Sequence, residues 1–230
     1  MDRREALNGL GILAGGSIAG GCLIPGVEAA EHRSKTPVEG FHLYLCAFHI
    51  AKKNPKFQIE AHHYCSMVEE GIHQCVIFDK VGEHARILGV EYIISDKLYR
   101  DLPDAEKKYY HPHSYEVLSG QLMAPDMPEK EEAKLMAGLV TTWGKTWHTW
   151  PDPKTALPMG EPLLMWSIGG DGQLDPALLA DRDRRLKVST AKVRKRRASL
   201  GRVPQIDPPR SVDDLGRQWT NEGPDRPKRK

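Results

Sequence analysis

Four consecutive segments rich in β-branched, aromatic and other apolar residues constrain the fold of this chain more than any other feature of its sequence. They occupy residues 41–50, 57–67, 72–78 and 86–94. Short polar stretches separate them, and Glu69-Glu70-Gly71 is typical of a hairpin turn. Because sequential strands joined by short turns run in opposite directions, the pattern predicts a mostly antiparallel sheet.

Later segments add short helices and further strands. Ser95 is suited to cap a short helix that ends at Leu102. Residues 128–140 combine a proline near the start, glutamates in the first turn and one apolar face, which predicts a longer helix. Further strands are expected at residues 115–123, 145–150 and 162–167. The predicted fold class is therefore α+β, with a mostly antiparallel sheet and short helices in a single domain at residues 41–168.

Residues 1–30 have the features of an export signal. Arg3 and Arg4 precede a weakly apolar, glycine-rich stretch, which is the arrangement that the twin-arginine route recognises. A signal peptidase could cleave after Ala29, whereas Cys22 ends a relaxed lipoprotein box and could be acylated instead. We therefore expect a periplasmic protein or a membrane-anchored lipoprotein. A disordered N-terminal arm on a cytoplasmic protein is the simpler alternative.

A linker at residues 31–40 and a basic tail at residues 169–230 flank the expected domain. Residues 171–230 carry 16 Lys and Arg against 9 Asp and Glu. A helix starting near Asp175 has a narrow stripe of apolar residues seven positions apart, so the tail is expected to be partly helical or disordered. Its charge suits a lipid or membrane surface. No nucleic-acid partner is expected, and no run of about 18 apolar residues could span a bilayer.

Histidines provide the main chemical signal, since nine of the ten lie within residues 42–148. On a strand, His62 and His63 face opposite sides, so each can serve a different face. His111 and His113 share a face if their segment is extended. Imidazole and carboxylate ligands suit a divalent transition metal such as Zn, Fe, Cu or Mn. The candidate metal ligands are His62, His63, His111, His113 and Glu116.

Glu91 stands inside the apolar segment Ile87–Ile94 and is the candidate catalytic residue. A buried carboxylate is costly unless it is paired, protonated or bound to a metal. Glu91 is therefore interpreted as a metal ligand, a general base, or the ion-pair partner of Lys145 or Arg86. His148, which alternates with two tryptophans, either lines a pocket or packs as a structural residue.

Several other reactions find no support in the sequence. It contains no GxSxG elbow, no phosphate-binding GxxxxGK[ST] loop, no GxGxxG after a strand and no HExxH. Outside the expected signal, Cys46, Cys65 and Cys75 form no CxxC pair, which argues against a structural zinc knuckle. One disulfide and one free thiol are possible among them.

The blocks around these residues resemble the oil-body-associated protein family, a domain of unknown function. The matching blocks are Glu60–Cys65, Gln74–Asp79, Leu88–Ser95, Leu102-Pro103, His111–Val117, Ser119-Gly120, Gly144-Lys145 and Leu157–Pro162. Plant members are associated with seed lipid bodies, and the resemblance implies a family without implying a mechanism. The first functional hypothesis is a metal-binding protein that could be an enzyme. The alternative is a non-enzymatic lipid- or membrane-associated protein in which the histidines and glutamates form a buried structural network.

Overall fold

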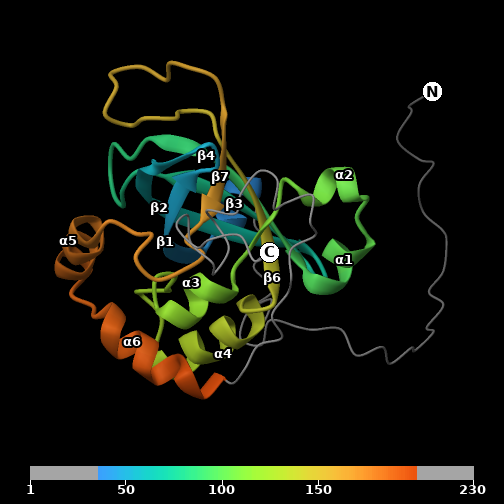
Figure 1. The fold of residues 1–230 in the computed structure, drawn as a ribbon, viewed down its shortest axis with the longest axis vertical. Helices are drawn as coiled ribbons and strands as arrows, with labels where there is room; N and C mark the ends of the chain where they lie inside the picture. Colours follow the sequence, from blue (N-terminus) through green and yellow to red (C-terminus); the bar gives the residue numbers. More distant parts are fainter. Residues whose placement is uncertain (1–35, 201–230) are drawn as a thin grey trace, which may run out of the picture.

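The computed structural model describes residues 36–200, and Figure 1 shows how their strands and helices are arranged. The expected export signal and the possible lipoprotein cysteine, Cys22, lie outside the described residues, as does the end of the expected tail. Of the expected linker at residues 31–40, the described part includes a short 3-10 helix, η1 (Pro37–Gly40).

Seven strands form one antiparallel sheet, which confirms the expected strand pairing. The strands are β1 (Leu43–Ala51), β2 (Asn54–Glu69), β3 (Ile72–Phe78), β4 (Ile87–Ser95), β5 (His111–Pro112), β6 (Thr142–His148) and β7 (Leu163–Ser167). Their order is β4-β3-β2-β1-β7-β6-β5, and β4 also pairs with β6. That additional pairing closes six strands into a barrel, with β5 paired to the end of β6. The α+β class was expected from the sequence, but closure of the sheet was not.

The side chains that point into the barrel form apolar and polar layers. Leu45 and Ala47 on β1 belong to one apolar cluster, whereas Ala51 on the same face belongs to another. His49 lies between them on that face, because side chains alternate between the two faces of a strand. On β2, His63 likewise lies between Cys65 of the first cluster and Ala61 of the second. A polar layer therefore crosses the barrel between two apolar layers.

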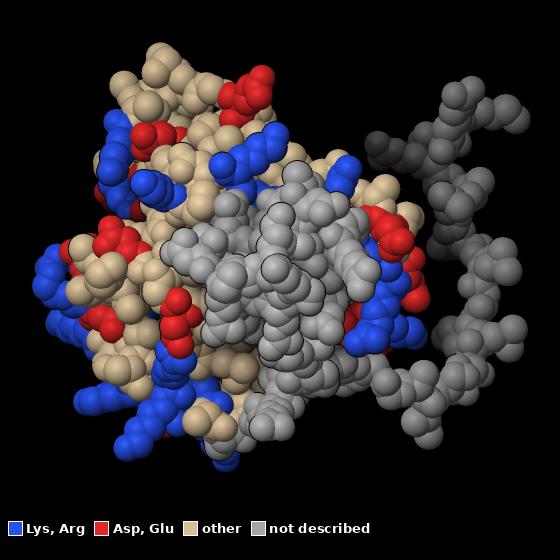
Figure 2. Space-filling model, viewed as in Figure 1, with Lys and Arg blue, Asp and Glu red and all other residues tan. Residues whose placement is uncertain are grey.

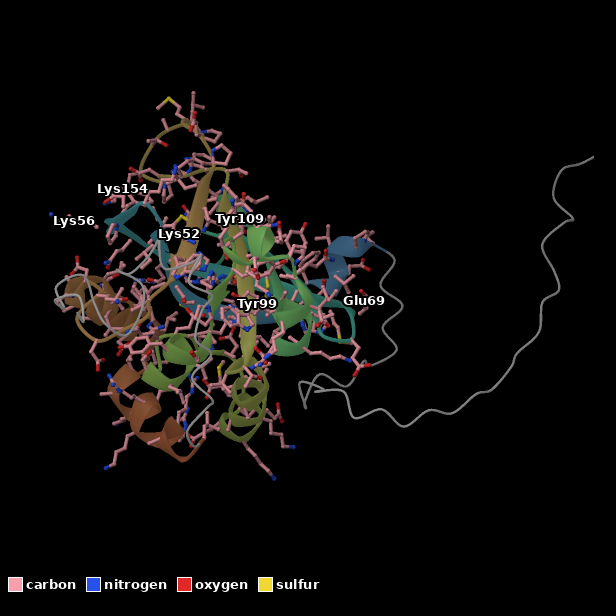
Figure 3. All side chains as sticks on the ribbon, turned by 45° about the vertical axis from the view of Figure 1, so that its right-hand side comes forward. Lys52, Lys56, Glu69, Tyr99, Tyr109 and Lys154 are labelled. Carbon is pink, nitrogen blue, oxygen red and sulfur yellow. A yellow bond between two sulfur atoms is a disulfide. The ribbon has the colours of Figure 1, made fainter. Side chains whose placement is uncertain are left out.

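Helices cover the outside of the barrel and one of its ends. They are α1 (Asp96–Asp101), α2 (Asp104–Lys107), α3 (Ser114–Ser119), α4 (Glu129–Leu139), α5 (Pro176–Leu186) and α6 (Thr190–Arg197), followed by the 3-10 turn η2 (Ala198–Leu200). In Figure 1, α3, α4 and α6 gather beneath the barrel, and α1 and α2 lie to one side. The ring of Tyr99 on α1 stacks on Trp143 of β6 with centroids 3.5 Å apart, and Figure 3 labels Tyr99 at this junction. Ser95 caps α1 as expected, by accepting a hydrogen bond from the backbone N–H of Leu98.

The strand expected at residues 115–123 was wrong, because its first part forms helix α3. A short apolar run does not distinguish a strand from a buried helix by its periodicity. The helix ends at Gly120, whose φ of +81° is the left-handed conformation that favours glycine after a helix. A side chain on Gly120 would also meet the backbone oxygen of Thr190 at 2.8 Å, so α6 packs closely against this turn.

The first part of the expected tail at residues 169–230 is packed structure. Phe48 and Ile50 on the outer face of β1 form an apolar cluster with Leu174 and with two leucines of α5. Arg182 and Arg197 are almost completely buried. Arg197 donates hydrogen bonds to the carbonyl oxygens of Val117 and Leu122 and pairs with Glu132 at 2.5 Å. Helices α5 and α6 thus pack on the barrel, while outward side chains such as Lys192 and Lys195 remain exposed.

Two further features of the described residues bear on the expectations. Cys65 and Cys75, which lie opposite each other on β2 and β3, form a disulfide, and Cys46 is a buried free thiol. Within residues 36–200, no helix has the length and apolar character needed to cross a membrane.

Replacing Arg197 tests the packing of α6. Arg197→Ala removes one of the two arginine partners of the buried Glu132 carboxylate and the donor to two buried carbonyl oxygens, so we expect a loss of about 2–3 kcal/mol in the free energy of unfolding. Arg184→Ala is the matched control, because Arg184 is 72% exposed in a surface pair and should contribute less than about 1 kcal/mol. Urea denaturation followed by circular dichroism measures both. Equal losses in the two variants would contradict the buried role of Arg197.

Candidate functional site

Glu91 on β4 is the centre of the polar layer inside the barrel, with 2% of its surface exposed. Its Oε2 atom lies 2.9 Å from Nε2 of His63 and 3.7 Å from Nε2 of His49. Its Oε1 atom lies 3.1 Å from Nε2 of His113 and 3.4 Å from Nε2 of His111. One carboxylate thus faces four imidazoles, two on each oxygen.

Barrel topology explains why these residues meet. β1, which carries His49, and β4, which carries Glu91, are three strands apart in either direction around the six-stranded circuit, so their inward side chains face each other. His63, on the neighbouring strand β2, is opposite Leu45 in the register, and its ring reaches within 3.1 Å of the ring of His49. His111 on β5 and His113 at the start of α3 enter from the end of β6, opposite Gly144.

Further imidazole contacts extend the cluster. Nε2 of His63 lies 3.1 Å from Nε2 of His49, and Nδ1 of His49 lies 3.0 Å from Nε2 of His148. Glu116 on α3 approaches from the other side, with its Oε1 atom 3.8 Å from Nε2 of His113. The interior therefore holds five imidazoles and two carboxyl groups, all buried.

The hydrogen bonds of Thr142 define the tautomer of His113. The Thr142 hydroxyl donates its single proton to the carbonyl oxygen of Leu139 at 2.7 Å. Nδ1 of His113 lies 2.7 Å from the same hydroxyl oxygen, so it must be the donor of that contact. In a neutral His113 the remaining nitrogen, Nε2, then presents a lone pair to Oε1 of Glu91. A cation, either a proton or a metal ion, has to lie between these two atoms.

The two carboxyl groups respond differently to burial. Burial alone would raise the pKa of Glu91, but the polar contacts with His111, His113 and His63 favour its charged form and hold the pKa well below its usual range. Burial, together with the negative charge of Glu91, raises the pKa of Glu116 well above its usual range. Glu91 is therefore the anion of the layer, and Glu116 is a neutral acid in the absence of a bound cation.

Burial keeps several imidazoles neutral. It lowers the pKa of His49 well below the usual value, and the neighbouring His63 lowers it further. Burial also lowers the pKa of His111, and it lowers that of His148 to about 3. A neutral imidazole keeps a lone pair that can bind a metal ion.

Five buried polar atoms of this layer have no hydrogen-bond partner among the described residues. They are Nδ1 of His63, His111 and His148, Oε2 of Glu116 and Oγ1 of Thr146. Thr146 belongs to the layer because it is the β6 residue directly opposite Glu91. Buried polar atoms are nearly always satisfied in folded proteins, so such a cluster indicates a site for an ion or for ordered water.

Gly144 on β6 leaves the space that the donor atoms occupy. A Cβ atom added at this position would lie 2.0 Å from Oε1 of Glu91. It would also lie 2.7 Å from Nε2 of His113 and 2.8 Å from Nε2 of His111. Any side chain here would displace the carboxylate and both imidazoles.

His62 belongs to a separate group on the outer face of the barrel. Its Nε2 atom lies 3.1 Å from Oε1 of Glu60, and its Nδ1 atom lies 2.9 Å from the hydroxyl of Tyr44. Glu60 is also paired with Arg185, and the thiol of Cys46 lies 3.6 Å from its Oε1 atom. Both ring nitrogens of His62 thus have partners, and an arginine already balances the carboxylate. Burial raises the pKa of Cys46 to about 12, so this thiol stays protonated.

The structure brings together most of the residues expected at the site. His63, His111, His113 and Glu116 surround Glu91, whereas His62 lies on the opposite face of β2. The expected alternation of His62 and His63 is confirmed.

The two expected ion-pair partners of Glu91 lie elsewhere. Lys145 pairs with Glu106 and Arg86 contacts the carbonyl of Pro153, so neither is the partner of Glu91. No role was expected for His49 from the sequence, although this residue stands two positions from Ala47 on the buried face of its strand. This two-residue spacing from a buried position was the signal in the sequence that could have placed His49 inside the barrel. His148, which was expected either to line a pocket or to pack as a structural residue, contacts His49 in the cluster.

Comparison with known proteins identifies relatives over most of the chain. The model of a family described as a protein of unknown function, DUF1264, matches residues 35–201. Oil body-associated protein 1B of Arabidopsis thaliana is 39% identical over 181 residues, which cover 78% of this chain and 75% of the relative. Oil body-associated protein 1A of Zea mays is 40% identical over 165 residues, which cover 71% of this chain and 69% of the relative. Oil body-associated protein 2A of Arabidopsis thaliana is 31% identical over 198 residues, which cover 85% of this chain and 78% of the relative. No solved structure matches the chain.

Gly144→Ala tests the packing of the polar layer. The added methyl group overlaps Glu91, His113 and His111, so we expect a loss of about 1–3 kcal/mol in the free energy of unfolding. Gly40→Ala is the control, because its Cβ would meet only Ser66, at 3.9 Å, and should change stability by less than about 0.5 kcal/mol. Chemical denaturation compares the two variants. A Gly144→Ala protein as stable as the control would show that the layer is not packed as described.

Proposed function

This chain belongs to the DUF1264 family of oil body-associated proteins, and we propose that its function is to bind a divalent transition metal inside the barrel. The proposed ligands are His63, His111, His113 and Glu91, with His49 and Glu116 beside them. Imidazole and carboxylate donors without a thiolate suit Zn, Mn, Fe or Cu.

The lone pair of His113 is the observation that carries this proposal. Thr142 accepts a hydrogen bond from Nδ1 of His113, so the neutral ring directs its unprotonated Nε2 at Oε1 of Glu91, 3.1 Å away. Metal-bound histidines commonly donate their other ring N–H to such a neighbouring acceptor, which fixes the ring and its tautomer. Thr142 would have this role for His113.

Contact lengths around Glu91 also favour an ion over hydrogen bonds alone. The contacts of 3.4 Å to His111 and 3.7 Å to His49 exceed the usual length of a hydrogen bond. Ligand atoms that share one ion at bonds of about 2.1 Å lie roughly 3–3.5 Å apart. The two shorter contacts, to His63 and His113, suit either arrangement.

Burial restricts what the ion could do. His63, His111, His113 and Glu91 each expose 2% or less of their surface. A large substrate cannot reach donors so deep in the barrel, so the ion would act on small molecules or stabilise the fold. We propose that Glu91 is a ligand and not a general base, because four imidazoles already contact its oxygens.

Metal content of protein purified without an affinity tag tests the proposal. We expect a stoichiometric transition metal in the wild type and a loss of at least about tenfold in metal affinity in Glu91→Gln, which keeps the shape but removes the charge. His63→Gln should lose metal as well. His62→Gln is the matched control, because it changes the adjacent histidine on the opposite face of β2 and should retain the metal.

Two outcomes would contradict the inner site. Wild-type protein with no stoichiometric metal, when purified without chelator, would favour a buried hydrogen-bonded network in its place. Loss of metal in His62→Gln, with full retention in His63→Gln, would move the ion to the outer group of Cys46, Glu60 and His62.

Association with a lipid surface is a second candidate function, supported by a basic face on α6. Lys192, Arg194 and Lys195 are exposed on this helix, and Figure 2 shows Lys and Arg gathered on this part of the molecule. The names of the relatives associate them with oil bodies. A truncation before α5 cannot test this role, because α5 and α6 cover the barrel.

Charge reversal on α6 avoids that problem. Lys192→Glu combined with Lys195→Glu changes two exposed positions, and we expect it to abolish cosedimentation with vesicles that contain an anionic phospholipid. Wild-type binding should weaken as salt is raised. Lys53→Glu combined with Lys56→Glu is the control, because it reverses two lysines in the turn and first residues of β2. Equal binding by the α6 variant and the wild type would exclude α6 as the contact.

A further inference from the structure

We infer that the site holds two metal ions bridged by the carboxylate of Glu91, an inference that rests on the proposed metal-binding function. The donor atoms form two groups, and within each group all atoms lie within 4.8 Å of one another. One group is His49, His63 and Glu91, and the other is Glu91, His111 and His113. Glu91 is the residue that they share.

Each oxygen of Glu91 serves a different group. Oε2 faces His63 and His49, whereas Oε1 faces His113 and His111. A carboxylate that binds one ion through each oxygen is the usual bridge of two-metal sites, whose ions lie roughly 3.5–4 Å apart. One ion bound to both oxygens would be drawn toward one pair of imidazoles and away from the other.

Separations in the first group fit one ion. Nε2 of His49 and Nε2 of His63 are 3.1 Å apart, and they lie 3.7 Å and 2.9 Å from Oε2 of Glu91. Three atoms so spaced leave a point about 2 Å from each, which is the usual bond length from zinc to nitrogen or oxygen. Two nitrogens 3.1 Å apart that both face a carboxylate oxygen are also better explained by a shared ion than by a shared proton.

The second group has an additional ligand in Glu116. Its Oε1 atom lies 3.8 Å from Nε2 of His113, and its buried Oε2 atom has no partner among the described residues. A cation bound to His111 and His113 would supply that partner. Glu116 would then add a second negative charge. Two carboxylates, instead of Glu91 alone, would then balance the charge of the two ions.

The chain holds the two groups independently. His49 and His63 come from adjacent strands β1 and β2, whereas His111 and His113 come from the segment that pairs with the end of β6. Each pair also has its own support: His148 contacts His49, and Thr142 contacts His113. Losing a histidine from one pair therefore leaves the other pair in position.

Titration with Mn²⁺ tests the inference on the full chain after treatment with a chelator. The electron paramagnetic resonance signal of free Mn²⁺ should stay absent while metal is added, until each chain has bound two ions. The bound pair should give the spectrum of two exchange-coupled ions. His49→Gln and His111→Gln should each bind one ion without coupling. Binding of one ion per chain also shows that the variant has folded, because the remaining group of ligands must be intact to bind that ion.

Each other result overturns a different claim. Wild type that binds one ion, or two ions without coupling, overturns the bridged pair but leaves the proposed function. Wild type that binds none overturns both. Complete loss of binding in both single-histidine variants shows that the groups do not act independently. A drop to one ion in His62→Gln assigns the second ion to the outer group and overturns the bridge.

Discussion

The carboxylate of Glu91, buried in a closed barrel and surrounded by imidazoles, is the interaction on which the interior depends. An isolated charge in such a place would cost several kcal/mol. Two imidazoles on each of its oxygens offset that cost and keep it ionised. Since these imidazoles come from β1, from β2 and from residues 111–113, the carboxylate also links β4 to segments with which it does not pair. The apolar layers on either side exclude water and so strengthen these electrostatic contacts.

Elements outside the barrel position the layer. Helix α3 carries Glu116 and begins next to His113, and α6 packs on α3 at Gly120. Arg197 of α6 donates hydrogen bonds to carbonyl oxygens at Val117 and Leu122, on either side of that turn. The C-terminal helices therefore support the site although none of their side chains reaches it. Gly144 contributes by leaving room for the donors.

Sequence alone predicted the parts of this arrangement that follow from local periodicity. The antiparallel strands, the cap at Ser95 and the opposite directions of His62 and His63 are all set by neighbours within a few residues. Closure between β4 and β6 depends on pairs of residues that are 47 to 59 positions apart, and no local pattern encodes it. For the same reason an ion pair of Glu91 with Lys145 or Arg86 stood among the expected alternatives, beside a metal ligand and a general base. His49 was overlooked because its role appears only when the opposite wall of the barrel is in place.

The packing of α5 and α6 had a similar cause. Their sequences are so rich in charge that solvation seemed the simpler expectation, yet Arg182 and Arg197 are buried with partners from distant segments. A charged side chain can be interior when carbonyl oxygens and a carboxylate surround it, which composition does not reveal. The segment that follows the barrel is therefore part of the domain up to α6.

Closure of the barrel around donors that expose so little surface has a kinetic consequence. With β6 paired to β4 the wall around the donors is closed, so an ion would enter either during folding or through a transient local opening of the wall. Exchange of such an ion would then be as slow as those openings. If the proposed site binds a metal, the ion bound there would be the one available where and when the chain folds, whatever the order of intrinsic affinities.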